Sequence, residues 1–323
     1  MHRQWAVLHG FVPNFGEAEN LLDLKEARTV SRKIESSRRA FLTNTGALLT
    51  SEVVNRWASG RQESVGQTAP RKQGKPRVID CHAHAGISRE PGAKEEHSAP
   101  WDTAADPEII LEHAREAGID KTIIFPINNT TYKEANEEIS QICQRYPERF
   151  AGFARHDART ECGKIRSMLI HEIHDLGLRG LKLHTQPNTE ILDAAKELGI
   201  PILYDSNQHV ELFEEFLSSY PTINFIIPHM GSDQSENWRE HLLAIDLAKR
   251  YPNVHLDTAA VVLTEYLEKA IKELPAEQIL FASDEPEIDC RLEIFKIRVL
   301  NLPKEKEELI LGGNITRLLG GRV

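Results

Sequence analysis

The chain has 323 residues and a formal net charge of −10, with 40% hydrophobic and 27% charged residues. This composition is ordinary for a globular enzyme, and the acidic balance argues against a nucleic-acid partner. No apolar run approaches the about 18 residues that a membrane-spanning helix needs, so no membrane partner is expected. The four cysteines have no paired spacing and are expected to be free thiols.

Residues 1–76 form an N-terminal extension whose charge differs from that of the rest. Residues 1–75 carry twelve Lys and Arg against seven Asp and Glu, a net charge of +5, whereas the remainder of the chain carries −15. Residues 57–76 are rich in Gly, Ser, Gln, Pro and Lys, which is typical of a linker.

Within this extension, Arg38 and Arg39 precede a mildly apolar stretch and predict a twin-arginine export signal. The pair lies far from Met1, and Glu52 interrupts the apolar stretch. A short amphipathic helix in a cytoplasmic protein is therefore the alternative to export into the periplasm or medium.

From residue 77 to residue 323, apolar β-rich runs alternate with amphipathic helical stretches. The runs are 77–82, 121–126, 150–154, 178–184, 201–205, 224–229, 254–257 and 279–284. The helical stretches are one that begins at Asp106-Pro107, then 132–146, 161–176, 189–198, 210–219, 237–250 and 262–274. Eight such repeats predict an α/β fold, the (β/α)8 TIM barrel. A doubly wound sheet is disfavoured because no Gly-x-Gly-x-x-Gly turn follows a strand.

Active sites of such barrels lie at the C-terminal ends of the strands. His82 and His84 are two residues apart on the first strand and should share one face, with Cys81 and Ala83 on the other. Polar side chains stand at seven strand ends and should converge: His82, His84, His156, Asp157, Lys182, His184, Asp205, His229, Asp257 and Asp284.

These residue types have a shared chemistry. Neutral imidazoles together with a carboxylate bind zinc or a similar divalent ion. Such an ion lowers the pKa of water to roughly 7, a carboxylate nearby can move the proton, and a further histidine can polarise a carbonyl. The pattern predicts hydrolysis by a metal-activated water.

Several of these segments resemble the amidohydrolase-related (amidohydrolase 2) family. The similarity lies in residues 80–84, 180–184, 227–231, 253–258, 280–284 and 311–319, in the family's order. The resemblance implies a metal-dependent TIM barrel. Members of this family hydrolyse amides, esters or lactones, and some decarboxylate aromatic or semialdehyde acids.

Carried over by position, the resemblance implies that His82 and His84 are metal ligands. Asp284 would be a ligand or the general base, and His229 would act on the substrate or serve as base. His184 would line the substrate pocket. We expect one divalent ion, with Zn first and Mn as the alternative.

Strand five departs from the family pattern, because Asp205 stands where a metal-binding histidine is usual. Asp205 is expected to ligate in its place, with His184 or His209 as the alternative third ligand. Lys182 could be a carboxylated ligand between two metals, but an ion pair with Asp205 or Asp284 is the simpler interpretation.

The sequence therefore predicts a metal-dependent hydrolase of a small carbonyl compound, with Asp284 moving protons and His229 giving electrophilic help. A decarboxylase would share this site and use Arg155, Lys182 or Arg291 to hold a carboxylate. A barrel that has lost its metal and only binds a ligand is the third alternative. A homodimer is one expected assembly, and residues 85–105 could form a lid.

Overall fold

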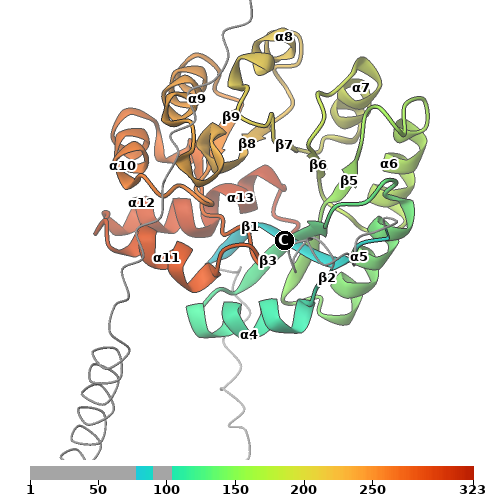
Figure 1. The fold of residues 1–323 in the computed structure, drawn as a ribbon, viewed down its shortest axis with the longest axis horizontal. Coiled ribbons are helices and arrows are strands. Elements are labelled where there is room, and N and C mark those ends of the chain that lie inside the picture. The colour runs from blue at the N-terminus through green and yellow to red at the C-terminus, as the bar shows by residue number, and fades with distance from the viewer. Residues whose placement is uncertain (1–77, 90–103) are drawn as a thin grey trace, which may run out of the picture. The chain divides into compact units, whose positions relative to one another are not determined.

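Eight strand positions follow one another in chain order around a closed barrel of parallel strands (Figure 1). The computed structural model describes residues 78–89 and 104–323. The barrel strands are β1 (Ile79–Ile87), β3 (Lys121–Pro126), β4 (Phe150–Gly152), β5 (Ala154–His156), β6 (Leu181–Leu183), β7 (Ile202–Tyr204), β8 (Phe225–Ile227), β9 (Val254–Asp257) and β10 (Ile279–Leu280). β4 and β5 are two halves of one strand position, so the eight predicted runs are confirmed.

Hydrogen bonds close the barrel at both places where its ladders are interrupted. The ladders run β2-β1-β3-β4 and β10-β9-β8-β7-β6-β5, and β2 (Ala104–Ala105) is an antiparallel addition to the end of β1. Between β4 and β5 the strand is continuous: the Phe153 N–H donates to the Ile124 carbonyl of β3 at 3.0 Å, and the Ala154 N–H donates to the Gly180 carbonyl, just before β6, at 2.9 Å. Between β10 and β1, the Asp284 N–H donates to the His82 carbonyl at 2.8 Å. The predicted TIM barrel is therefore confirmed.

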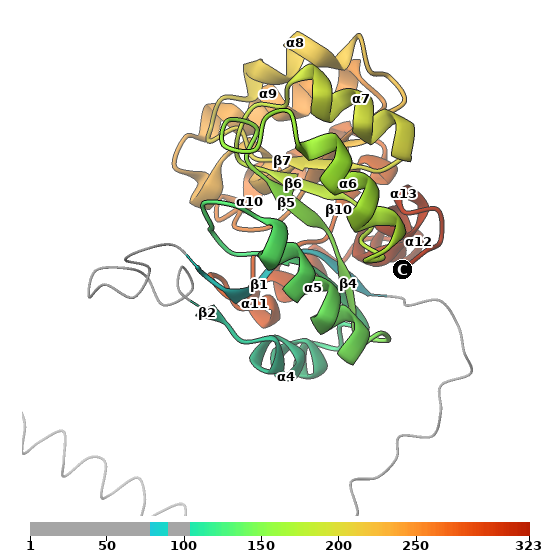
Figure 2. The same cartoon turned by 90° about the vertical axis from the view of Figure 1, so that its right-hand side faces the viewer.

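Most helices surround the strands on the outside, and the last one packs against one end of the barrel interior (Figure 2). They are α4 (Pro107–Ala117), α5 (Lys133–Arg145), α6 (Ile165–His174), α7 (Thr189–Leu198), α8 (Glu214–Leu217), α9 (Trp238–Arg250), α10 (Thr264–Glu273), α11 (Cys290–Arg298), α12 (Lys304–Glu308) and α13 (Asn314–Leu318). Short 3-10 turns are η1 (Val210–Phe213), η2 (Pro228–Gly231), η3 (Asp233–Ser235) and η4 (Ala276–Gln278), and η5 (Leu309–Gly313) is a π turn. Asp106 caps α4 as predicted, because its side chain accepts from the Glu108 N–H at 2.9 Å.

An apolar cluster fills the lower barrel interior and supports the polar layer above it. Its members come from inward positions of the strands and from α13: Ile79, Cys81, Ile123, Phe125, Ala151, Phe153, Leu203, Ile226, Leu280, Ala282, Ile315, Leu318 and Leu319. The prediction that Cys81 points away from this interior is wrong. The pairing of β1 with β3 shifts register between Asp80 and Ala83, so Cys81 packs inside while His82 and His84 still reach the cavity above.

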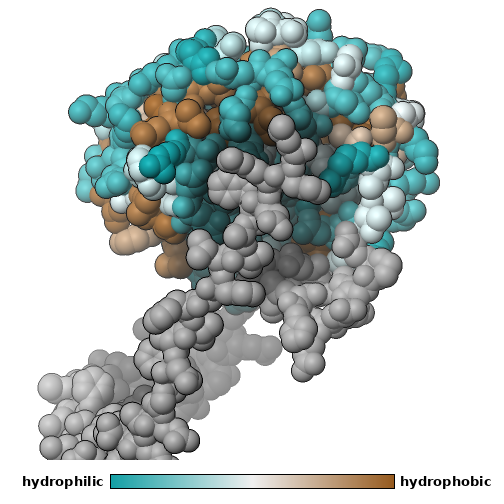
Figure 3. Space-filling model, turned by 45° about the horizontal axis from the view of Figure 1, so that its top comes forward, coloured by the Kyte–Doolittle hydropathy of each residue, from teal (hydrophilic) through white to brown (hydrophobic). Residues whose placement is uncertain are grey.

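The face shown in Figure 3 is mainly hydrophilic, with apolar patches among the hydrophilic areas. On α11, Leu292 is 66% and Phe295 is 63% exposed. No helix among the described residues is both long enough and apolar enough to cross a membrane. The predicted twin-arginine signal, the linker and their boundary at residue 76 lie outside the described residues, as do residues 90–103 of the predicted lid.

Candidate active site

A cavity of about 350 Å³ opens where the strands end. All eight residues predicted for the site line it: His82, His84, Arg155, Lys182, His184, Asp205, His229 and Asp284. They come from six different strand positions, so the barrel brings together side chains that lie far apart in the sequence. Most of the residues that line the cavity are polar or charged.

The His82 ring is fixed from behind by Asp257 at the end of β9. His82 is fully buried, and its Nδ1 lies 2.8 Å from Asp257 Oδ2. Burial alone would raise the pKa of Asp257, but the charge and hydrogen bond of His82 hold that pKa below its usual value. An ionised Asp257 accepts a hydrogen bond from the Nδ1–H of His82, which leaves Nε2 directed at the cavity.

His84 and His229 are held in the same way by backbone carbonyls. His84 Nδ1 lies 3.4 Å from the Pro126 carbonyl oxygen, and His229 Nδ1 lies 3.2 Å from that of Ala259. The backbone N–H of His229 also donates to Asp257 Oδ1 at 2.8 Å. His229 adopts a left-handed backbone conformation, with φ of +55°, that a non-glycine residue rarely takes. All three rings therefore present Nε2 to the cavity.

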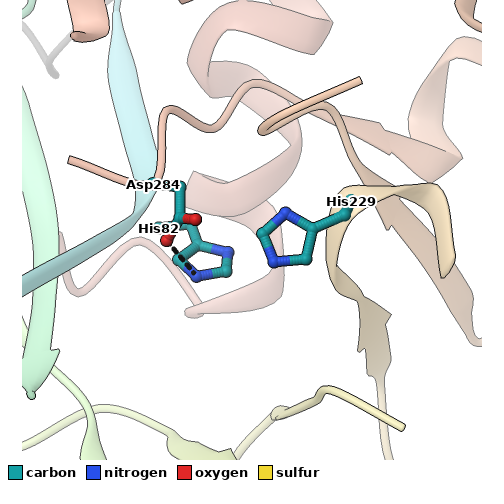
Figure 4. A group of neighbouring side chains, drawn as sticks. All are labelled: His82, His229 and Asp284. Atoms are coloured by element: carbon teal, nitrogen blue, oxygen red, sulfur yellow. Dashed lines mark ion pairs between the residues drawn. The ribbon is translucent and has the colours of Figure 1, made fainter. Parts of the chain in front are cut away.

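Asp284 stands against two of these nitrogens. Its Oδ1 lies 3.1 Å from His82 Nε2 and 3.3 Å from His84 Nε2, and its own backbone is left-handed, with φ of +67°. Burial opposes ionisation, but the charge and hydrogen bond of His82, together with His84, hold the pKa of Asp284 well below its usual value. The ligand atoms of His82, His229 and Asp284 all lie within 4.8 Å of one another (Figure 4).

This donor set fits a divalent transition metal. It combines imidazole nitrogens with a carboxylate oxygen, and the second nitrogen of each ring is tied to an oxygen. The local charge fits as well. Burial and Lys182 lower the pKa of His82, yet Asp284 and Asp257 raise it to about 9, so the carboxylates favour positive charge at this ring.

Asp205, at the end of β7, faces the same cavity from the opposite wall. Its Oδ2 lies 3.6 Å from His184 Nε2 and 3.9 Å from His229 Nε2. Two ligands that are each about 2 Å from one ion can be up to about 4 Å apart, so Asp205 can share an ion with His229. His209 lies outside the cavity with an exposed ring beside Glu211, so it is not placed to be the third ligand.

Lys182 is fully buried at the base of the cavity, with its Nζ 3.4 Å from His82 Nε2. The predicted ion pair is absent, since no carboxylate of the described residues lies within 4.0 Å of this ammonium group. Burial lowers the pKa of Lys182 to about 8, although Asp205 and Asp284 oppose that change. Its charge therefore acts on the site through space.

Arg155 points into the cavity but is surrounded by acceptors of the protein. Its Nη1 donates to the Pro126 carbonyl at 2.9 Å, and its Nη2 contacts Asn128 Oδ1 and, at 2.6 Å, His184 Nδ1. Arg291, another cation considered for a substrate carboxylate, lies outside the cavity and pairs with Asp289 and Glu116.

Three of the polar residues at strand ends do not line the cavity: Asp257, which lies behind His82, and two residues that point elsewhere. His156 follows Arg155 on β5 and therefore points to the opposite side, where Glu161 and Glu172 each lie 2.8 Å from one of its ring nitrogens. Asp157 turns to the exposed Arg159. The prediction that every polar strand end converges on one cavity is wrong for these three residues.

Six lining residues are not among those predicted from the sequence: Ile127, Asn128, Asn207, Asp233, Pro286 and Glu287. Each lies in a loop or short turn that follows a strand. Their position after a strand was the available signal, but loop shape decides which of such residues turn inward.

The sequence matches a family model described as Amidohydrolase over residues 79–321. Comparison with curated proteins gave no significant match.

Among solved structures, three similar folds are enzymes with named reactions. One is 5-carboxyvanillate decarboxylase from Sphingomonas paucimobilis, with 16% identity, a TM-score of 0.59 and coverage of 76% of this chain and 99% of that chain. Another is dihydroxybenzoic acid decarboxylase from Polaromonas sp. JS666 with bound manganese and the inhibitor 2-nitroresorcinol, with 16% identity, a TM-score of 0.58 and coverage of 75% of this chain and 96% of that chain. The third is 4-oxalomesaconate hydratase from Rhodopseudomonas palustris, with 19% identity, a TM-score of 0.56 and coverage of 76% of this chain and 96% of that chain. At these identities the similarity is one of fold.

Proposed function

The chain belongs to the amidohydrolase family, and we propose that it is a metal-dependent hydrolase of a small carbonyl compound, an amide, ester or lactone. The observation that carries this proposal is the cluster of His82, His84 and His229 around Asp284. Each ring has its Nδ1 bound and its Nε2 facing the cavity, and an ionised carboxylate stands beside them.

We propose that His82, His84, His229 and Asp284 hold one divalent ion, with Asp205 as a further ligand. Zn²⁺ suits the mixed nitrogen and oxygen donors, and Mn²⁺ is the alternative because a similar structure holds manganese. When bound, such an ion lowers the pKa of water to roughly 7 and polarises a carbonyl oxygen.

The residues of the chain supply the remaining functions. Asp284 is kept ionised, so it can accept a proton from the attacking water and pass it to the leaving group. The Asp257 carboxylate contacts the ring of His82 and accepts a hydrogen bond from the backbone N–H of His229, which fixes the positions of both residues. Lys182 places positive charge below the reacting carbonyl.

The position of Arg155 favours hydrolysis over decarboxylation. A decarboxylase must bind a substrate carboxylate, and the guanidinium group would be its best partner. Here Nη1 and Nη2 both contact acceptors of the protein itself. Decarboxylation stays the second candidate, because Lys182 could hold a carboxylate alone and because several of the similar folds, including two of those named above, are decarboxylases.

A substrate panel tests the proposal. Zn²⁺-loaded and Mn²⁺-loaded protein would be mixed with small lactones, esters and amides, with proton release followed by an indicator dye, and with small carboxylic acids, with carbon dioxide followed directly. Hydrolysis that disappears in Asp284→Asn supports the proposal. Carbon dioxide release without hydrolysis would replace it with the decarboxylase.

Export by the twin-arginine route and assembly as a homodimer remain predictions. Residues 1–76 fused to a reporter that functions only after twin-arginine transport would test the first. Light scattering of the purified chain would test the second.

A further inference from the structure

The contact between Arg155 and His184 determines which nitrogen of the histidine carries its proton. Arg155 Nη2 lies 2.6 Å from His184 Nδ1. A guanidinium group has only donors and stays charged at any pH that a protein tolerates. His184 Nδ1 must therefore accept, and the proton of the neutral ring lies on Nε2.

Several contacts hold the Arg155 side chain in place. It is 3% exposed, and its Nη1 donates to the Pro126 carbonyl. Its backbone is fixed on both sides by Asn136, which accepts from the Arg155 N–H at 2.9 Å and donates to the Arg155 carbonyl at 3.1 Å. The guanidinium carbon lies 5.2 Å from the centre of the Tyr132 ring. These contacts fix the donor that faces His184.

The other nitrogen of His184 faces the site. His184 Nε2 lies 3.6 Å from Asp205 Oδ2 on the cavity wall. The ring lies nearly parallel to that of His84, with centroids 6.5 Å apart and an angle of 17° between planes. A substrate bound beside His84 would thus meet the N–H of His184.

We propose that Arg155 is a positioning residue that locks His184 as a neutral Nε2–H donor, and that His184, not His229, polarises the substrate carbonyl. The second part rests on the proposed hydrolase function. His229 Nε2 belongs to the cluster with His82 and Asp284, so it is committed to the ion and not to a carbonyl oxygen. The same tautomer excludes His184 as a metal ligand, since ligation by Nε2 would require the proton on Nδ1.

Because Nδ1 accepts the hydrogen bond of Arg155, the ring is neutral, and a neutral N–H donor is suited to a developing oxyanion.

Nitrogen NMR of the full chain tests the tautomer without a substrate. Protein labelled with ¹⁵N in its histidine rings would be recorded with Zn²⁺, and His184→Gln would identify the His184 signals by their loss. The expected spectrum shows Nδ1 unprotonated and Nε2 protonated. A protonated Nδ1, or an Nε2 signal that disappears or shifts on metal loading as a ligand does, would overturn the lock.

Two variants show whether the hydrogen bond from Arg155 or merely a nearby positive charge determines the tautomer of His184. Arg155→Met is expected to give a mixture of tautomers, whereas Lys182→Met removes another buried cation and should leave the His184 tautomer unchanged. If Arg155→Met leaves the tautomer unchanged, Arg155 is not the positioning residue. If Lys182→Met changes it as Arg155→Met does, charge and not the hydrogen bond controls the ring.

The catalytic part is tested on a hydrolysed substrate from the panel. His184→Leu should lower kcat about 10²–10³-fold with a small effect on KM, and His184→Gln, which keeps an N–H donor, should recover part of the rate. Equal loss in both variants would contradict the donor role. Absence of hydrolysis in the wild-type protein would overturn the proposed function and the carbonyl role, while the spectrum still decides the lock.

Discussion

Two buried histidine clusters lie on opposite sides of the barrel wall, and only one can bind a metal. Inside, His82 uses Nδ1 for Asp257 and turns Nε2 towards Asp284 and the cavity. Outside, His156 uses both ring nitrogens, one for Glu161 and one for Glu172, each at 2.8 Å. Both clusters combine histidine with carboxylates, but the outer ring has no lone pair left for an ion.

Histidines and carboxylates at strand ends do not by themselves form a metal site. Arg155 and His156 are neighbours on one strand, yet one contributes to the cavity and the other to packing between the strand and its helices. The distinction lies in where each ring nitrogen finds its partner. The rings of the inner cluster keep one nitrogen directed at the cavity, where a ligand can bind. The ring of the outer cluster uses both nitrogens for contacts that stabilise the fold.

The largest expected difference concerns turnover. Asp284→Asn should lower kcat/KM for a hydrolysed substrate by about 10²–10⁴-fold, because a positioned general base is lost. Asp157→Asn, at a strand end outside the cavity, should keep the wild-type rate. Comparable rates for Asp284→Asn and the wild-type protein would remove Asp284 from the mechanism.

For the stability of the fold, the outer cluster should matter more than the inner one. His156→Leu leaves Glu161 and Glu172 buried without their shared partner and should lower the free energy of unfolding by about 3–5 kcal/mol. Urea denaturation would measure this loss. Adding Glu161→Gln and Glu172→Gln to the variant should recover much of it, and no recovery would show that the lost packing of the ring matters more than the unpaired charges.

Metal affinity should depend on the residue behind the inner ring. Asp257→Asn keeps the size of the side chain but removes its charge, and should weaken Zn²⁺ binding about 10–100-fold. Competition with a chromophoric chelator would measure the change. Glu172→Gln, the matched change in the outer cluster, should leave the affinity unchanged, and a similar loss in both variants would mean that the effect is general destabilisation.

The smallest effect is a pH dependence of stability. Burial lowers the pKa of His156, but hydrogen bonds to Glu161 and Glu172 raise it to about 9. Because this value exceeds the unfolded value of about 6.5, the stabilisation is complete below pH 6.5 and is lost as the pH rises through 9.

Between those limits the free energy of unfolding should fall by up to about 1.4 kcal/mol per pH unit from this one proton. His156→Gln should remove that slope in urea titrations between pH 6.5 and 9.5. A slope that persists in this variant would assign the proton to another group.

Sequence reasoning located the barrel and the inner cluster because both depend on local signals. Apolar runs and their spacing predicted the strands, and polar residues directly after them predicted the cavity wall. α11 was missed because Leu292 and Phe295 face solvent, which hides the amphipathic pattern of that helix.

Long-range partners could not be predicted from spacing. Asp257 is expected from its strand end to face the cavity, but it lies behind His82, and this contact joins residues 175 positions apart. The inward position of Cys81 depends on a register shift that strict alternation does not allow for. Asn128 and His184 both accept hydrogen bonds from the guanidinium group of Arg155. These contacts depend on the geometry of loops and side chains, which one sequence does not reveal.

Metal content tests the central claim most directly. Elemental mass spectrometry of the purified full chain, after loading with Zn²⁺ or Mn²⁺ and removal of excess ion, would compare the wild-type protein with His82→Ala and His156→Ala. We expect about one ion per chain in the wild-type protein and in His156→Ala, and none above background in His82→Ala. No bound metal under either loading condition, or equal metal in His82→Ala, would contradict the account.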